Sequence, residues 1–289
     1  MKKLYMILGL ILIVFLAVSV QQFMMPPKVQ ESITFFPIDP KVTYKKAETT
    51  LDVIKTPAQT LDWKTSSTLD RKAYLRQDAS LLYSNGRLVS EYHDWKQNTD
   101  TLVQEKQISI KESALLQAVT FHHAELHEKK DLIFSSQTMS ERQIYIVLSN
   151  SEAKSFYTPN SSDEKEWKQK LDEQTERMLQ LSWNKGVRQF SIKLDNYQAF
   201  PLSEFNRRAK DSLSGFSKAE TQRVVGNLWE GLYKNYLLGI KKADGTVESP
   251  LGSTIPLILV ANDKSHLLAL TETAKGEPIL LRQLIPDTD

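Results

Sequence analysis

The chain has 289 residues, contains no cysteine, and carries 37 basic and 35 acidic side chains, for a formal net charge of +2. The missing cysteines exclude disulfides, thiolate metal sites, iron–sulfur clusters and a cysteine nucleophile. The nearly balanced charge argues against nucleic acid as a partner. The length allows one or two globular domains, each with a hydrophobic core of its own.

The N-terminal residues have the composition of a membrane anchor. Lys2 and Lys3 precede an apolar run at residues 4–20, and no charged residue follows until Lys28. At ~1.5 Å per residue, a helix over residues 4–25 is long enough to cross a hydrocarbon core ~30 Å thick. The two lysines place the N-terminus in the cytoplasm, so the body of the protein is predicted to lie outside the cell membrane.

A cleaved signal peptide is the alternative to this anchor. Ala17 and Ser19 are small residues at the positions that a signal peptidase reads, which predicts cleavage after Ser19 and a secreted protein. The apolar run exceeds the usual ~7–15 residues of a signal-peptide core, so we favour the uncleaved anchor. Both alternatives export the body. Without the three lysines of residues 1–28, that body has 34 basic and 35 acidic side chains.

The composition divides the chain into four regions. Recurrent prolines after the apolar run fix φ and remove hydrogen-bond donors, which favours extended chain. The regions are a cytoplasmic tip and transmembrane anchor at 1–25, an extended stalk at 26–60, a β-rich subdomain at 61–150 and an α+β subdomain at 151–289. Grouped strands with few alternations of strand and helix predict an α+β fold, in which antiparallel sheets and a few helices follow the single transmembrane helix.

The first subdomain has strong hairpin signals. Asn85-Gly86 between apolar runs favours a type I′ turn, because both turn residues tolerate positive φ. Ser109 and Glu112 have capping-box spacing, which predicts a short helix at 114–119. The remaining elements predicted here are a strand at 101–108, a hairpin of 120–127 with 132–138, and a buried strand at 143–148.

The second subdomain has helical signals followed by a meander. Residues 163–183 carry apolar residues at helical spacing, with Gly186 as the expected stop. A capping box at Ser217 and Glu220 opens the strongest predicted helix. The predicted elements are helices at 163–183 and 218–241, a strand at 187–194, and a three-strand meander at 255–261, 266–271 and 278–285.

One cluster of residues has the composition of a metal site. Three of the five histidines lie between residues 122 and 127. On a strand, His123, Glu125 and His127 share one face and offer two imidazoles and a carboxylate to a divalent metal such as zinc. The same pattern also fits a solvated strand face with His122 beside apolar neighbours on the other face, and we favour this structural interpretation.

The sequence contains no other assembled catalytic motif. There is no G-x-S-x-G elbow, P-loop or dinucleotide-binding glycine pattern. We therefore expect a non-catalytic binding or regulatory module of the bacterial cell envelope, without a cofactor, that contacts another envelope or membrane protein. The alternative is a metal-dependent envelope hydrolase that uses zinc at the His122–His127 cluster.

Overall fold

The structure is a computed structural model, and it describes residues 33–54, 59–129, 132–149, 152–210, 212–242 and 245–285. The predicted membrane helix at 4–25, the cleavage position after Ser19 and the start of the predicted stalk lie outside the described residues. Among the helices of the described ranges, none combines the length and apolar character needed to cross a bilayer. The described chain has an α+β fold, as the sequence predicted.

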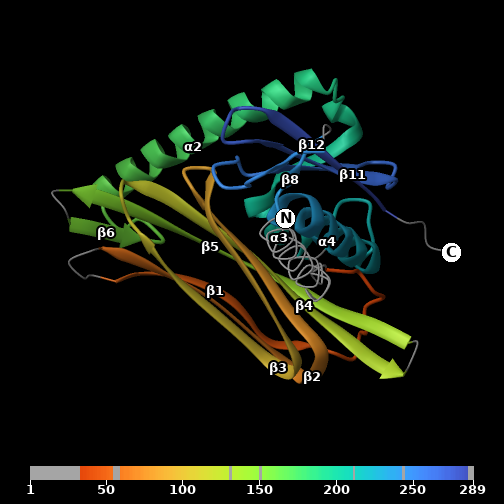
Figure 1. Ribbon diagram of the computed structural model, residues 1–289. Coiled ribbons are helices and arrows are strands. Elements are labelled where there is room, and N and C mark those ends of the chain that lie inside the picture. Colours follow the sequence, from red (N-terminus) through yellow and green to blue (C-terminus); the bar gives the residue numbers. More distant parts are fainter. Residues whose placement is uncertain are drawn as a thin grey trace, which may run out of the picture. The chain divides into compact units, whose positions relative to one another are not determined.

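A six-stranded antiparallel sheet occupies the first half of the described chain (Figure 1). Its strands are β1 (Tyr44–Ile54), β2 (Thr60–Ser84), β3 (Arg87–Ser109), β4 (Ala114–Lys129), β5 (Leu132–Ser149) and β6 (Glu152–Phe156). The order across the sheet is β1-β2-β4-β5-β6, and β3 pairs with β2 along its other edge. β1 pairs with the first half of β2, whereas β4 pairs with the second half.

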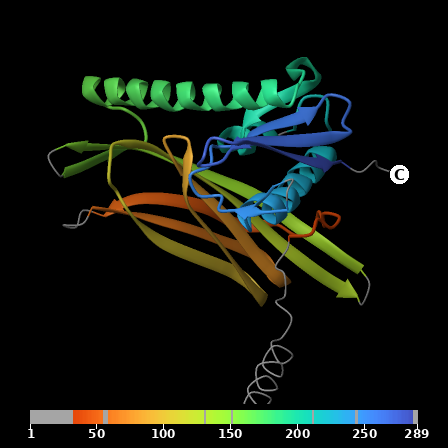
Figure 2. The same ribbon diagram turned by 45° about the horizontal axis from the view of Figure 1, so that its top comes forward.

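The large sheet folds back on itself. The pairing of β2 with β3 shifts register between Thr68 and Ala73, where the two long strands bend (Figure 2). The bend brings β1, which pairs with the first half of β2, against β4 and β5. The Thr49 hydroxyl on β1 is therefore 2.6 Å from the Ser140 hydroxyl on β5. The sheet therefore has an inner face that closes on itself and an outer face. Residues 44–54 of the predicted stalk are part of this sheet as β1.

The second half contains the helices and a smaller sheet. Its elements are α2 (Ser162–Gln189), β7 (Tyr197–Pro201), α3 (Leu202–Ala209), α4 (Lys218–Leu232), β8 (Ile240–Lys241), β9 (Val247–Glu248), β10 (Leu257–Ala261), β11 (His266–Glu272) and β12 (Pro278–Leu284). The smaller antiparallel sheet has the order β12-β11-β10-β7, and β8 pairs with β9. A 3₁₀ turn at Leu194–Asn196 precedes β7, and a π-helical turn at Tyr233–Leu237 follows α4.

The main hydrophobic core lies between the outer face of the large sheet, the helices and the small sheet. The rings of Phe121 on β4 and Trp229 on α4 stack with their centroids 5.2 Å apart. Trp183 on α2 donates its indole N–H to the carbonyl of Ile255, 2.9 Å away. This core draws on residues before and after position 150, and the division into subdomains 61–150 and 151–289 stays a prediction.

Several local predictions are confirmed. Asn85 and Gly86 have φ of 48° and 82° and connect β2 to β3, as a type I′ turn requires. Ser217 and Glu220 form both hydrogen bonds of the capping box that opens α4. The hairpin of β4 with β5 and the meander of β10, β11 and β12 are also present.

The predicted helix at 114–119 is wrong, because these residues begin β4. Both faces of the sheet are buried there, with Leu116 in an inner cluster and Val119 in the main core. A short apolar run buried on both faces cannot be distinguished from a buried helix by its periodicity. Residues 101–108 do form a strand, but they continue β3 and are not a separate element.

Three boundaries in the second half also differ from the predictions. α2 continues past Gly186 to Gln189. This glycine serves the packing of the helix and does not end it, because a Cβ at position 186 would lie 2.5 Å from Leu270 and its absence lets α2 approach β11. The predicted strand at 187–194 is instead the end of α2 and a 3₁₀ turn. The helix predicted at 218–241 is α4 as far as Leu232 and then the π-helical turn as far as Leu237, and Gly239 at φ 113° turns the chain into β8.

Candidate functional site

A layer of polar side chains lies inside the closed face of the large sheet. Apolar clusters flank the layer, one containing Leu61 and Trp63 and the other containing Leu69 and Leu126. The layer consists of Thr49, Ser67, Arg76, Asp78, Ser80, Thr120, His122 and Ser140, each at most 9% exposed. Buried polar groups are costly unless they are hydrogen-bonded, so the partners of this layer decide its role.

Asp78 is the centre of the polar layer. Its Oδ2 accepts a hydrogen bond from the Ser67 hydroxyl at 2.5 Å and lies 3.0 Å from Nδ1 of His122. The Arg76 guanidinium donates to the Ser67 hydroxyl at 2.6 Å and to the Asp100 carbonyl at 2.9 Å. Arg76 and Asp78 are both fully buried, with Nη2 of Arg76 3.7 Å from Oδ1 of Asp78. A buried cation thus has its counter-charge and its hydrogen bonds within the same layer.

The layer contains a carboxylate, an imidazole and a hydroxyl in series. Nε2 of His122 lies 2.8 Å from the Ser140 hydroxyl, which also contacts the Thr49 hydroxyl. This order of groups resembles that of a nucleophilic triad. However, the Ser140 hydroxyl points into the closed inner face and is bonded to a neighbouring strand. We therefore interpret the series as a network that holds β1, β2, β4 and β5 together.

The three residues of the predicted metal site lie along one face of β4. His123 is 1% exposed beside Phe121, and its ring nitrogens have no hydrogen-bond partner among the described residues. Burial, with a smaller contribution from Arg76, lowers the pKa of His123 to about 4. The face of β4 that carries His123 was predicted to be solvated, but at His123 it is buried.

Glu125 and His127 lie further along β4 and contact each other through Oε1 and Nε2. The imidazole of His127 also stacks on the Tyr74 ring, with 3.9 Å between centroids. On a strand, residues four positions apart are separated by ~13 Å, so His123 and His127 are distant from each other. The described residues contain no group of three or more His, Asp or Glu side chains placed to hold one metal ion.

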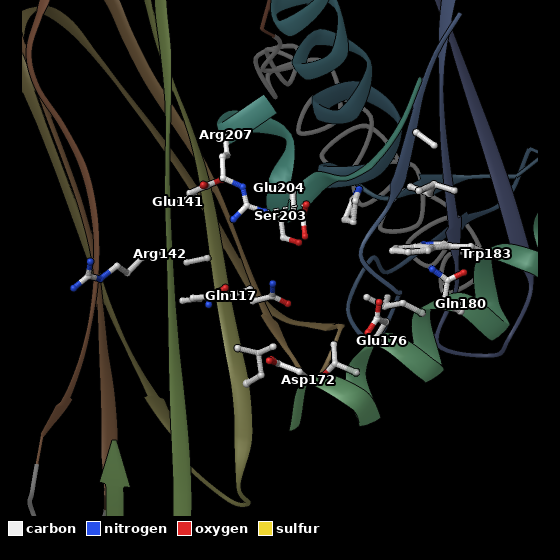
Figure 3. Close-up of a pocket in the computed structure, with 18 of the residues that line it drawn as sticks. Gln117, Glu141, Arg142, Asp172, Glu176, Gln180, Trp183, Ser203, Glu204 and Arg207 are labelled. Carbon is white, nitrogen blue, oxygen red and sulfur yellow. Dashed lines mark ion pairs between the residues drawn. The ribbon is translucent and has the colours of Figure 1, made fainter. Parts of the chain in front are cut away.

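A cleft of about 880 Å³ lies between α2 and the outer face of β4 and β5, with α3 at one end. Figure 3 shows Gln117 and Glu141 on the sheet wall, Asp172, Glu176, Gln180 and Trp183 on α2, and Ser203, Glu204 and Arg207 on α3. Leu115, Leu179, Val187 and Leu257 add apolar surface to the lining. The cleft is thus an open groove whose lining is both polar and apolar.

The charged residues of the cleft are unequally paired. Four carboxylates line the cleft, those of Glu141, Asp172, Glu176 and Glu204. Three cationic side chains also line it, those of Arg142, Lys168 and Arg207. Arg207 pairs with Glu204 at 2.9 Å, and Lys168 pairs with Asp172. Arg142 points away from the cleft in Figure 3 and lies over the ring of Tyr157 at 3.9 Å. Glu141 and Glu176 have no ion pair with a described residue.

Two buried polar atoms in the cleft lack a hydrogen-bond partner among the described residues. They are Oε2 of Glu141 and Oγ1 of Thr175, which is 5% exposed. Burial raises the pKa of Glu141. The charge of Arg207 is the next-largest effect and lowers this pKa, and the smaller effect of Glu204 raises it. Unsatisfied buried polar atoms are rare in folded proteins. Two of them occur together in this open cleft, which makes it the candidate binding site.

The sequence alone did not reveal this cleft. Its walls come from β4, β5, α2 and α3, and α3 was not predicted. The one available signal for α3 was the spacing of Leu202 and Phe205 after Pro201, which places both apolar side chains on the buried face of a helix. No local pattern links Glu141 to Thr175, because each belongs to an ordinary strand or helix sequence.

Comparisons of this chain with known protein families, with curated proteins and with solved structures find no match.

Proposed function

We propose that this protein is a single-pass membrane protein of the bacterial cell-envelope type, whose extracytoplasmic body is a non-catalytic binding or regulatory module. Residues 4–25 form the transmembrane anchor, and Lys2 and Lys3 remain on the cytoplasmic side. The partner is another envelope or membrane protein. Nucleic acid and cofactors have no part in this proposal.

The cleft between α2 and the large sheet is the observation that carries the proposal. Its volume of about 880 Å³ accommodates several side chains of a partner. Its lining combines apolar residues with carboxylates, as expected for recognition of a polypeptide segment. The buried series of Asp78, His122 and Ser140 lies inside the sheet and does not line this cleft. The cleft therefore supports binding rather than hydrolysis by that series.

Photo-crosslinking in intact membranes tests the proposal. A photoreactive residue replaces Gln180, which is exposed on α2 and lines the cleft, in the full-length protein. The matched control replaces Gln97, an exposed glutamine on β3 outside the cleft. We expect a discrete crosslinked envelope protein from position 180 and none from position 97. No crosslink from position 180, or the same crosslinks from both positions, would contradict the proposal.

The location of the protein is tested separately. The uncleaved anchor requires full-length protein in the membrane fraction, with an intact N-terminus and a body accessible to protease from outside the cell membrane. Release into the medium with a new N-terminus after Ser19 would instead support the secreted alternative. Protection of the body from external protease would contradict both alternatives.

The metal-dependent hydrolase remains the alternative function. The contact between Glu125 and His127 places a carboxylate and an imidazole together at a partly exposed position, with His127 31% and Glu125 17% exposed. An exposed pair of this kind provides two of the ligands that zinc requires, and further ligands would have to come from other groups. Metal analysis of the purified protein separates this alternative from the binding module.

A further inference from the structure

We propose that the cleft receives a segment of the partner polypeptide that places the cationic head of a lysine or arginine at Glu141 and apolar atoms of the same segment along Leu179 and Trp183. This inference rests on the proposed function of the cleft as the partner-binding site, and it names the chemistry that the site recognises.

The charge at Glu141 is the first part of the argument. Glu141, Glu204 and Arg207 lie together at the α3 end of the cleft (Figure 3). Arg207 is ion-paired with Glu204 at 2.9 Å and also acts on Glu141, so this end has two carboxylates that share one cation. A cation is the ligand that such a carboxylate favours, and the raised pKa of a half-buried acid shows that the free site disfavours the charge. A bound ammonium or guanidinium group would supply the missing hydrogen bond to Oε2.

Thr175 provides a second observation, independent of charge. Its side chain is 5% exposed, lies on α2 in the lining of the cleft, and its hydroxyl has no partner among the described residues. The hydroxyl and the carboxylate belong to opposite walls of the same cleft. A ligand with polar groups between the walls would satisfy both atoms.

The apolar wall fits the apolar atoms of such a polypeptide segment. Leu179 and Trp183 line the cleft and are each 6% exposed. The indole of Trp183 is held in place by its hydrogen bond to the Ile255 carbonyl. Lysine and arginine bury their methylene groups on apolar surface while the charged head reaches a polar partner. A small inorganic cation would leave this apolar wall unused, and an anion would meet the unpaired carboxylates.

Peptide binding to the full-length protein in nanodiscs tests the inference. The probe is a fluorescein-labelled peptide of nine residues in which lysine alternates with alanine, and the comparison peptide carries acetyl-lysine at the same positions. Acetylation keeps the chain length but removes the charge. From the usual strength of charge-assisted hydrogen bonds, we expect fluorescence anisotropy to report roughly tenfold to hundredfold weaker binding of the acetylated peptide.

Variants of the protein assign the effect to the cleft. Glu141→Gln should weaken binding of the lysine peptide by roughly the same factor, with little effect on the acetylated peptide. Glu112→Gln, at an exposed position outside the cleft, should change neither affinity. Failure of the lysine peptide to bind, equal affinity for both peptides, or equal effects of the two variants would overturn the inference.

Stability measurements distinguish a binding role from a structural one. Thr175→Val removes a buried hydroxyl without a protein partner, and Glu141→Gln removes the charge of a half-buried carboxylate, so neither should lower the melting temperature of the free protein. Both should weaken binding of the lysine peptide. A lower melting temperature with unchanged binding would assign these residues to the fold and overturn the inference. A position-180 crosslink in intact membranes that survives Glu141→Gln would reject the cationic ligand while leaving the proposed function in place.

Discussion

Asp78 and His122 are hydrogen-bonded inside the closed face of the large sheet, with Oδ2 of Asp78 3.0 Å from Nδ1 of His122. The two residues are 44 positions apart and lie on neighbouring strands, β2 and β4. Neither side chain is exposed. Their contact joins the buried Arg76 to the hydroxyl groups of Ser140 and Thr49, and so connects four strands through one carboxylate.

The first prediction concerns that carboxylate. Asp78→Asn should lower the free energy of unfolding by about 3–5 kcal/mol, because Arg76 then remains buried without a counter-charge. Urea unfolding measures the change. Asp70→Asn is the matched control, since Asp70 pairs with Arg71 at the surface, and it should have a much smaller effect. Equal effects of the two variants would contradict the structural role of the network.

The second prediction concerns the pH dependence of stability at His123. The unfolded imidazole binds a proton below pH ~6.5, whereas the folded imidazole, with its pKa lowered to about 4, does not until lower pH. The unfolded state therefore binds more protons in this window, and stability falls as the pH falls. By pH ~4.5, this residue alone should cost roughly 2–3 kcal/mol relative to pH ~7.5.

Chemical unfolding at both pH values checks this prediction. His123→Gln should remove that part of the loss, because glutamine does not titrate. The part of the loss that comes from His123 should persist in His127→Gln, the matched histidine variant on the same strand. A pH dependence that is the same for wild type and His123→Gln would show that His123 is not the group responsible.

The third prediction compares two helical glycines. Gly186→Ala should destabilise the protein, because its Cβ would lie 2.5 Å from the buried Leu270 side chain, and overpacking costs about 1–3 kcal/mol. Gly231→Ala should be neutral or stabilising by up to about 1 kcal/mol, because its nearest neighbour is the amide end of Gln283 at 3.2 Å. The midpoint of thermal unfolding should fall in Gly186→Ala and should not fall in Gly231→Ala. A stabilising Gly186→Ala would contradict the close packing of α2 on β11.

Local sequence signals predicted those elements of the fold that depend only on neighbouring residues. Asn85-Gly86 and the Ser217–Glu220 capping box were identifiable because each acts through the backbone of its own few residues. The Ser109–Glu112 spacing misled, since sheet pairing on both edges of β4 overrides a weak capping signal. Gly186 misled for a related reason, because its role depends on Leu270, 84 positions later in the chain.

The candidate site was less accessible to sequence reasoning than the fold. The histidine cluster was conspicuous by composition, but strand alternation places His122 and His123 on opposite faces of β4. The closed inner face buries His122, packing beside Phe121 buries His123, and His127 lies near the surface. The cleft depends on how α2 packs against the sheet. Glu141 and Thr175 become notable only when that packing leaves both without hydrogen-bond partners.

The fourth prediction separates the two classes of function. We expect purified full-length protein, after dialysis against buffer without chelator, to contain zinc well below one equivalent by elemental analysis. The matched comparison is the double variant His123→Ala with His127→Ala. Stoichiometric zinc in the wild type that is lost in this variant would contradict the binding-module account and support the hydrolase.

The central claim is that the cleft binds a protein partner through Glu141, and crosslinking yield in intact membranes measures it most directly. With the photoreactive residue at position 180, the account predicts a discrete adduct whose yield falls at least severalfold in Glu141→Gln and is unchanged in Glu112→Gln. The account would be contradicted if position 180 gave no adduct, or if the yield were the same in both variants.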